Sequence, residues 1–337
     1  MIVSVFVYII LLFLSLFVIV LLSALIFNAI ITPLWLTTPS PEGRMIASPD
    51  IKLFSRIRGE GNPVVVIETW SGGPSFEWWH IQDELSKHCR VVTYDRAGYG
   101  WSERDNLPRT SDQVATGLKL MLENSNITGP YILVGHSLGA LYVNHFARKY
   151  ADNTAAVIMI DPFSPDNQRW YDEFPDHKVF YDKEKAVRTG KIFAMLGLMR
   201  LFRFVPYLHV PKKIRRLVIN HYSSQRAYHA ILNELSNWRQ SAEQIKNLPS
   251  FPDIPLKILF PATEATIKSW TAFKVPEDLA RKMEHLHELL AKDMLAYSSK
   301  SELIVIPDTT HAIHLDQPEL VAENIIQSIY EIRGKTQ

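Results

Sequence analysis

The chain lacks the features of several protein classes. Its 337 residues include one cysteine, Cys89, which excludes a disulfide framework and a metal cluster built on cysteine alone. Its 36 lysines and arginines stand against 35 aspartates and glutamates, so we expect no basic surface of the kind that binds nucleic acid. The leading segment also has no charged residue: the first one in the chain is Glu42. Apolar residues make up 47% of the chain, enough for a large core, which excludes a disordered protein.

The uncharged leading segment predicts a membrane anchor. Ile2–Ile31 consists mostly of Ile, Val, Leu and Phe, and it is longer than the roughly 20 apolar residues that a helix needs to cross a bilayer. We expect a transmembrane anchor over residues 1–35, with Trp35 at the membrane interface, and then a linker over 36–50. Pro33, Pro39 and Pro41 are expected to end the helix and to stiffen the linker. A cleaved signal peptide, which usually has a basic start and a shorter apolar stretch, and a buried globular helix are the alternatives.

The basic residues near the anchor give its orientation. Arg44 follows the segment and no basic residue precedes it. The positive-inside tendency therefore favours a single-pass membrane protein whose body faces the cytoplasm.

The body alternates short apolar runs with helical patterns. Such alternation predicts an α/β fold with a mainly parallel sheet covered by helices on both faces. The predicted strands are Val64–Glu68, Arg90–Tyr94, Tyr131–Val134, Ala156–Ile160, Leu256–Phe260 and Leu303–Ile306.

One interval interrupts this alternation. Residues 163–251 have helical patterns without a clear strand, and we interpret them as a helical cap inserted into a core of residues 51–162 and 252–337. Basic residues outnumber acidic ones almost two to one in this interval. Its segment Leu196–Asn220 alternates bulky apolar and basic side chains, which fits either a solvated helix packed on its apolar side or a surface resting on anionic lipid.

The strongest chemical signal is Gly135-His136-Ser137-Leu138-Gly139, between a predicted strand and a predicted helix. This is the G-x-S-x-G nucleophile elbow, in which a strained turn projects the serine hydroxyl above the sheet and the small glycines leave room for the turn. We therefore predict that Ser137 is a nucleophile. The amide of Leu138, at the helix N-terminus, is the first donor for an oxyanion.

Two further segments resemble the α/β-hydrolase family. Residues 94–102, Tyr-Asp-Arg-Ala-Gly-Tyr-Gly-Trp-Ser, look like its D-x-x-G-x-G-x-S turn. Residues 310–318, Thr-His-Ala-Ile-His-Leu-Asp-Gln-Pro, look like its G-H-x-x-H-L-E-Q-P ending. The resemblance covers essentially all of residues 50–335 and implies a hydrolase fold with a helical cap, working as a serine hydrolase.

The resemblance also implies the rest of a catalytic triad. His311 is the expected base, with His314 as the alternative, and a shared metal site is a further interpretation of the pair. Two residues could be the acid that orients the histidine. Asp161 ends a strand and matches a subgroup of these hydrolases, whereas Glu264 lies where most of the family keeps its acid.

The second oxyanion donor is implied by the loop after Val64–Glu68. Aligning Thr69-Trp70-Ser71-Gly72 with the family's H-G-x-x places this amide on Ser71, although threonine and tryptophan replace the usual histidine and glycine. Because an amide needs no particular side chain, the oxyanion hole can survive this departure.

The predicted function is a membrane-anchored hydrolase that cleaves an ester, thioester or amide bond of a small-molecule or lipid-like acyl substrate. No cofactor is implied, because the sequence has no phosphate loop, dinucleotide fingerprint or metal-ligand spacing. The alternatives are a non-catalytic interaction module, a haloperoxidase and a peptidase. The sequence does not indicate an oligomeric state.

Overall fold

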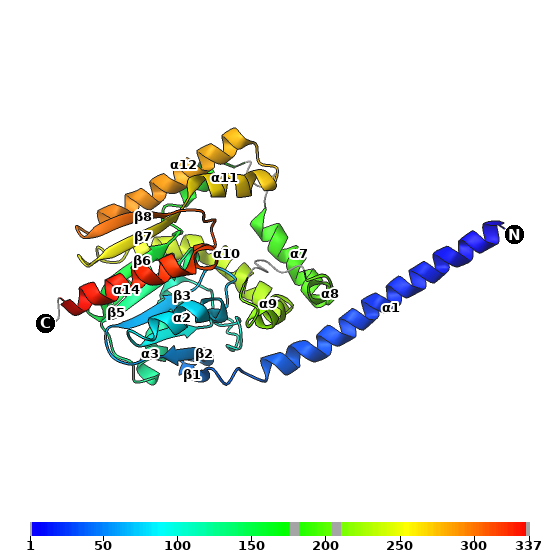
Figure 1. Cartoon of the computed structure of the whole chain (residues 1–337), viewed down its shortest axis with the longest axis horizontal. Helices are drawn as coiled ribbons and strands as arrows, with labels where there is room; N and C mark the ends of the chain where they lie inside the picture. Colours follow the sequence, from blue (N-terminus) through cyan, green and yellow to red (C-terminus); the bar gives the residue numbers. More distant parts are fainter. Residues whose placement is uncertain (1, 176–181, 204–209, 335–337) are drawn as a thin grey trace.

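An eight-stranded sheet forms the centre of the body in the computed structural model, which describes residues 2–175, 182–203 and 210–334 (Figure 1). The strand order is β1-β2-β4-β3-β5-β6-β7-β8. The strands are β1 (Arg44–Ser48), β2 (Ile51–Arg58), β3 (Val64–Glu68), β4 (Val91–Tyr94), β5 (Tyr131–His136), β6 (Thr154–Ile160), β7 (Leu256–Pro261) and β8 (Ser301–Ile306).

Strands β3 to β8 run parallel, whereas β1 and β2 form an antiparallel hairpin whose second strand pairs with β4. The six predicted strands are all present. The hairpin was not predicted, and the expected linker over 36–50 is too long, because β1 lies within it. The apolar run of β1 is only three residues long, Met45-Ile46-Ala47, which is too short to predict a strand, and its pairing with β2 is what stabilises it.

Alternate residues of each central strand face opposite layers of helices. Val64 and Val66 of β3 pack in the cluster that includes Leu118 and Phe146, from α3 (Ser111–Asn124) and α4 (Leu138–Lys149). Val65 and Ile67 pack on the other face with α2 (Trp79–Leu85) and α14 (Pro318–Gly334), the red helix in front of the sheet in Figure 1. The predicted α/β fold with a mainly parallel, doubly covered sheet is confirmed.

The remaining helices of the core lie near the last strands and in short connections. They are α11 (Thr263–Ala272), α12 (Glu277–Asp293), α13 (Ile313–Asp316) and the 3-10 turns η1 (Ser75–Trp78), η2 (Ala151–Asn153) and η3 (Met294–Tyr297).

Helices occupy the interval between β6 and β7. They are α5 (Gln168–Glu173), α7 (Lys183–Met195), α8 (Leu198–Phe202), α9 (Arg215–Tyr222) and α10 (Gln225–Lys246). The long helix α10 buries Trp238 and Ile245 against Leu141 and Tyr142 of α4. The boundary of the cap at 163–251 stays a prediction, with α10 as its closest connection to the core.

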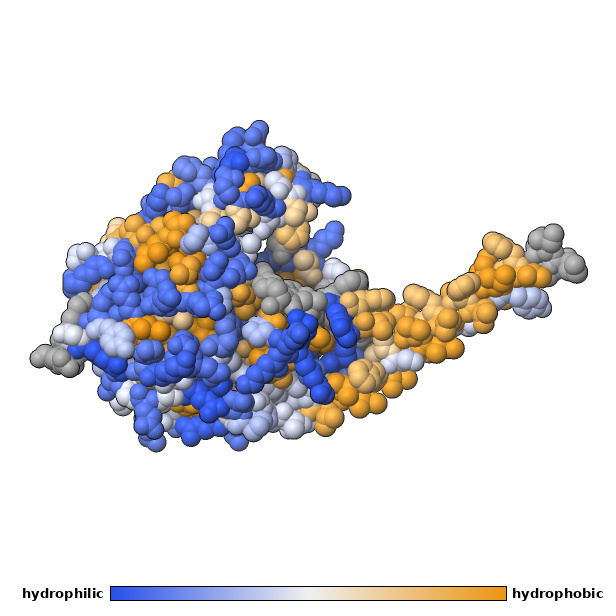
Figure 2. All heavy atoms as spheres, in the orientation of Figure 1, coloured by the Kyte–Doolittle hydropathy of each residue, from blue (hydrophilic) through white to orange (hydrophobic). Residues whose placement is uncertain are grey.

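The leading helix α1 (Ile2–Leu36) projects from the body, and its surface is almost entirely apolar (Figure 2). From Val5 to Leu36 it is long and apolar enough to cross a membrane. Two details of the prediction are wrong. The helix continues through Pro33 to Leu36, and Trp35 is buried against Trp101, 5.4 Å between ring centroids, instead of lying at a lipid interface.

Candidate active site

Ser137 lies in a strained turn between β5 and α4. Its φ of 54° falls in the left-handed region, which is costly for a residue with a Cβ. The turn is held against the next strand by a hydrogen bond from the Ser137 amide to the carbonyl of Ile160, 2.9 Å long. A Cβ on Gly139 would lie 2.5 Å from the carbonyl oxygens of Glu68 and Thr69, so the loop after β3 can approach this turn only because residue 139 is glycine.

The loop after β3 carries Ser71 and runs beside the start of α4. Two of its amides already have partners: that of Gly72 donates to the Tyr99 hydroxyl at 2.9 Å, and that of Gly73 to the carbonyl of Trp70 at 3.2 Å. These bonds favour Ser71 over Gly72 as the second oxyanion donor. The assignments of Leu138 and Ser71 to an oxyanion hole stay predictions.

Arg96 holds the backbone of the loop after β3 in place. Its guanidinium donates to the carbonyl oxygens of Thr69 and Trp70, at 2.8 Å each. It also pairs with the buried carboxylates of Glu68 and of Glu234 from α10, the second at 2.8 Å. Burial alone would lower the pKa of Arg96, but the two carboxylates raise it well above its ordinary value, so the side chain stays charged.

Asp161 and His311 are in direct contact. His311 Nδ1 lies 2.6 Å from Asp161 Oδ2, which is the geometry of a histidine oriented by an acid. Asp161 directly follows β6, is 2% exposed, and has a φ of 40°. Burial alone would raise its pKa, but the charge of His287 and the hydrogen bond to His311 hold the pKa below the ordinary value. The acid is therefore ionised at neutral pH.

The other predicted acid lies elsewhere. Glu264 is in the first turn of α11 with an exposed side chain, and it pairs with Arg281 of α12 at 2.8 Å. The structure thus brings Asp161, and not Glu264, to His311.

The loop that carries His311 is held at both sides. The amide and hydroxyl of Thr310 donate to Asp316 at 2.8 and 2.7 Å. His136 Nε2 contacts the carbonyl oxygen of His311 at 2.8 Å. Burial lowers the pKa of His136 to about 3, so this ring is neutral and its Nε2–H is the donor.

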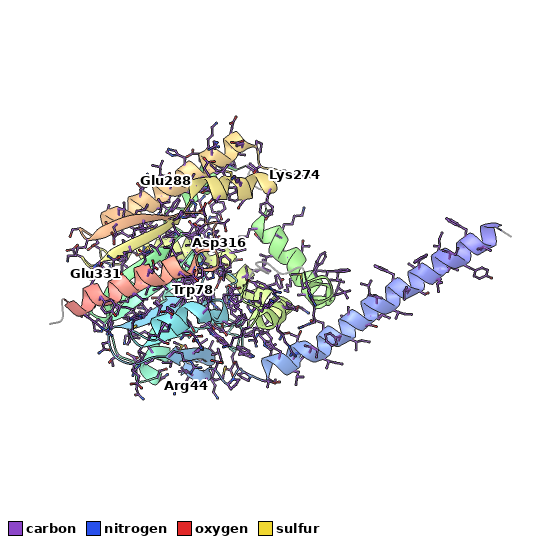
Figure 3. All side chains as sticks on the ribbon, viewed as in Figure 1. Arg44, Trp78, Lys274, Glu288, Asp316 and Glu331 are labelled. Atoms are coloured by element: carbon purple, nitrogen blue, oxygen red, sulfur yellow. The ribbon has the colours of Figure 1, made fainter. Side chains whose placement is uncertain are left out.

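Aromatic rings surround this loop. The indole of Trp70 stacks on His136 and lies 5.6 Å from His311 between ring centroids. His314 is fully buried and stacks on Trp78 at 4.5 Å. Trp78 and Asp316 are labelled near the centre of the body in Figure 3. His314 therefore supports the loop, whereas the half-exposed His311 has the access that a base needs.

His287, from α12, contacts the other oxygen of the same acid. Its Nε2 lies 3.2 Å from Asp161 Oδ1, and its Nδ1 lies 3.7 Å from the buried Glu284, which accepts a hydrogen bond from Trp270. Burial alone would lower the pKa of His287, but Asp161 and Glu284 raise it to about 9. Sequence reasoning missed the roles of His287, His136 and Trp70, because only the folded chain brings them to Asp161 and His311.

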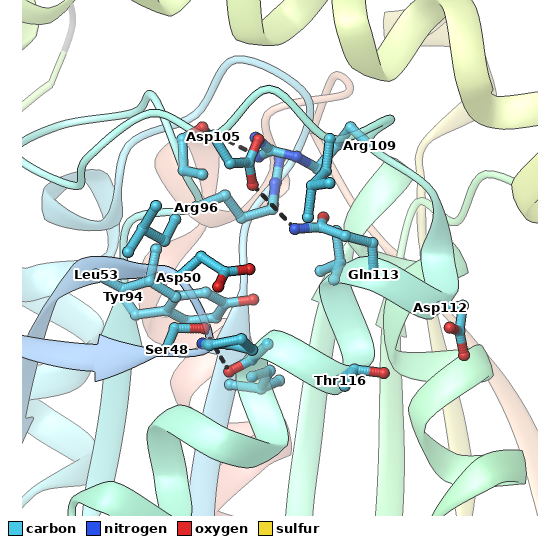
Figure 4. Close-up of a pocket in the computed structure, with 17 residues that line it drawn as sticks. Ser48, Asp50, Leu53, Tyr94, Arg96, Asp105, Arg109, Asp112, Gln113 and Thr116 are labelled. Carbon is cyan, nitrogen blue, oxygen red and sulfur yellow. Dashed lines mark hydrogen bonds and ion pairs between the residues drawn. The ribbon is translucent and has the colours of Figure 1, made fainter.

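A separate cavity of about 270 Å³ lies beside α3 and the β1–β2 hairpin (Figure 4). Asp105 pairs there with Arg109 and accepts a hydrogen bond from Gln113. Ser137, Asp161 and His311 are not among its lining residues. The cavity is therefore separate from the site that contains the predicted catalytic residues.

Comparisons with known proteins place the chain among relatives of the same architecture. The sequence profile of the Alpha/beta hydrolase family matches residues 68–324. Uncharacterized protein YbdG of Bacillus subtilis is 24% identical over 290 residues, 82% of each chain. The (Lyso)-N-acylphosphatidylethanolamine lipase of Bos taurus is 29% identical over 134 residues, 39% of this chain and 34% of the lipase.

Among solved structures, a thermophilic esterase from Thermogutta terrifontis with malate bound superposes with a TM-score of 0.60. The two chains are 20% identical, and the match covers 86% of this chain and 98% of the esterase. At this identity the likeness shows the fold alone, since one fold hosts many activities.

Proposed function

Because the chain belongs to the Alpha/beta hydrolase family, we propose that it is a membrane-anchored serine hydrolase that forms an acyl-enzyme on Ser137. The bond cleaved is an ester, or a thioester or amide. The observation that carries the proposal is the 2.6 Å contact between His311 Nδ1 and Asp161 Oδ2. Asp161 directly follows Ile160, whose carbonyl accepts the amide of Ser137 in its strained turn at 2.9 Å.

The proposed chemistry assigns one step to each group. With Nδ1 of His311 bound to Asp161, Nε2 is left to take the proton of the Ser137 hydroxyl as its oxygen attacks the carbonyl carbon. The oxyanion that forms is stabilised by the amides of Leu138 and Ser71. His311 then gives the proton to the leaving group as the scissile bond breaks.

Water completes the cycle. It loses a proton to His311, attacks the acyl carbon and releases the acid, and the proton returns to Ser137. Asp161 stays ionised throughout and stabilises the imidazolium, which is the role its lowered pKa supports.

The substrate we propose is lipophilic or lipid-like. A helix that can cross a membrane would hold the enzyme where such molecules partition, and a relative that matches over part of the chain is a lipase. We further propose that α1 is retained as a single-pass anchor and that the catalytic body faces the cytoplasm, because Arg44 follows the helix.

A fluorophosphonate probe tests the nucleophile. The detergent-solubilised wild type should be labelled covalently, Ser137→Ala should not, and Ser236→Ala, which removes an exposed hydroxyl on α10, should be labelled normally. A folded but unlabelled wild type would instead indicate the non-catalytic module. A series of p-nitrophenyl esters then tests the substrate class, and a preference for short acyl chains would contradict the lipid-like substrate.

A further inference from the structure

We propose that the corner of the cap formed by the end of α7 and by α8, residues Lys191–Arg203, is embedded in the interfacial layer of the membrane beside α1. The anchor would then be part of the cap, and the cap itself would contact lipid. This inference rests on the membrane anchor of the proposed function and adds a second point of contact with lipid.

Helix α1 has two different halves. From Val5 to Val20 every side chain is exposed, whereas from Leu21 onward one face is covered by the body. The covered positions include Leu21, Ala24 and Asn28, three to four residues apart, which is the spacing of one helix face. The second half of α1 is therefore docked on the cap.

A polar contact fixes this docking. The side-chain amide of Asn28 donates to the carbonyl of Ala194 at 2.8 Å. Arg200 of α8 donates to Asn28 Oδ1 at 3.2 Å and also to the side chain of Asn220. Asn28 is 7% exposed, so this polar side chain of a mainly apolar helix is buried with hydrogen-bond partners on the cap.

The backbones of α1 and of the cap are also in close contact. Gly197, between α7 and α8, has a φ of +73°, and a Cβ there would clash with the carbonyl oxygen of Ala24. The turn that connects α7 to α8 thus packs directly against the helix backbone, at the level of Ala24–Asn28.

Lipid must reach the part of α1 that contacts the cap, Ala24–Asn28. On the side of α1 away from the cap, apolar side chains remain exposed alongside the contact: Ile26 is 59% exposed and Ile30 is 61% exposed. Exposed apolar side chains run from Val5 to Leu34, about 45 Å at 1.5 Å per residue, which is longer than the roughly 30 Å hydrocarbon layer and comparable to the 40–45 Å of the whole bilayer. Residues Ala24–Asn28 then lie at the boundary between hydrocarbon and headgroups.

The cap corner has the surface that this position requires. Apolar side chains are exposed on the end of α7 and on α8, namely Ile192, Met195, Leu196, Leu201 and Phe202. Basic residues are exposed next to them, namely Arg203, Lys212, Lys213, Arg215 and Arg216. Figure 2 shows hydrophilic residues beside the orange surface of α1 where the helix leaves the body. Apolar side chains flanked by cations are typical of elements that lie in an anionic membrane interface.

A depth measurement in vesicles tests the proposal. The full chain, with Cys89→Ala as background, receives a single fluorophore at Phe13→Cys, Phe202→Cys or Lys282→Cys and is reconstituted in vesicles of neutral and anionic phospholipids. Phe13 reports α1, Phe202 reports the cap corner, and Lys282 is an exposed control on α12. We expect lipid-borne quenchers to act on the labels at 13 and 202, and aqueous iodide to act on the label at 282.

The outcomes separate this inference from the proposed anchor. Lipid quenching at position 13 without quenching at 202 would overturn the cap contact and leave the anchor intact. An unquenched label at 13 would overturn the anchor, and the cap inference with it. A label at 202 that is protected from iodide without lipid quenching, and that transfers energy to a second labelled copy, would assign the patch to a dimer and overturn the proposal.

Enzyme kinetics provide a second test of the cap corner. Replacing both Leu201 and Phe202 with serine should raise KM for a vesicle-borne ester by about tenfold or more, because two large apolar side chains leave the lipid. The KM for a short soluble ester should not change. Equal effects on both substrates would contradict a role in membrane contact.

Discussion

His287 and Asp161 form a contact that a three-residue triad does not include: His287 Nε2 lies 3.2 Å from Asp161 Oδ1, opposite the oxygen bound to His311. The carboxylate is thus held from both sides. Rotation that brings it closer to one histidine weakens its contact with the other.

Replacing His287 tests this arrangement. His287→Gln should lower kcat about tenfold, which corresponds to about 1.4 kcal/mol, because loss of the ion pair releases the acid that orients His311. KM should stay nearly constant, since His287 is a positioning residue. His285→Gln, exposed on the same helix, is the control, and equal losses in both variants would contradict the role of His287.

The same contact predicts a pH dependence of stability. The folded pKa of His287, about 9, lies above the ordinary 6.5, so the charged ring stabilises the fold fully below about pH 6.5. This contribution is lost as the pH rises through 9. The free energy of unfolding of the wild type should fall across that window, measured by denaturant titration in detergent. His287→Gln should lack this component of the decline.

The identity of the acid is tested by comparing two carboxylates. Asp161→Asn should lower kcat by about 10³–10⁴-fold, because an amide no longer stabilises the charged and correctly oriented His311. Glu264→Gln should change kcat little, since it loses only an exposed ion pair with Arg281. Hydrolysis of one activated ester by both variants gives the comparison. A larger loss in Glu264→Gln would reverse the assignment.

Arg96 is predicted to stabilise the protein strongly. Arg96→Met leaves Glu68 and Glu234 buried without their cation, which should cost about 3–5 kcal/mol and lower Tm. Arg188→Met, which breaks an exposed pair with Glu184, should cost about 0.5 kcal/mol or less. Thermal unfolding of both variants measures the difference, and a Tm for Arg96→Met close to that of the wild type would refute it.

The docking of α1 on the cap predicts an asymmetry between two glycines. Gly197 and Gly61 both have positive φ, but a Cβ at Gly61 meets open space, whereas at Gly197 it meets Ala24. Both alanine variants carry the backbone strain of about 1–2 kcal/mol. Only Gly197→Ala should also expose the α1–cap contact to limited proteolysis. Identical protease patterns would argue against tight docking.

The sequence predicted those parts of the fold and the site that depend on local patterns. The β-branched run Val64–Glu68 is a strand, and the small residues around Ser137 form a turn, because each needs only its own neighbours. Asp161 and Glu264 could not be separated, since both follow strands at one edge of the sheet, and the choice depends on which one reaches His311. The hairpin β1–β2 was missed because pairing, not composition, determines it. His287 is likewise close to Asp161 only in the folded chain.

The buried pair between Arg96 and Glu234 also limits how the cap can move. Glu234 belongs to α10, and Arg96 holds the loop beside Ser137. Swinging α10 away from the core would separate two charges out of contact with water and release the loop at the same time. In the proposed hydrolase, substrate entry would therefore leave α10 in place, and we expect any movement of the cap in the helices nearer α1. The proposed access to Ser137 and the proposed attachment to the membrane would then involve the same part of the protein.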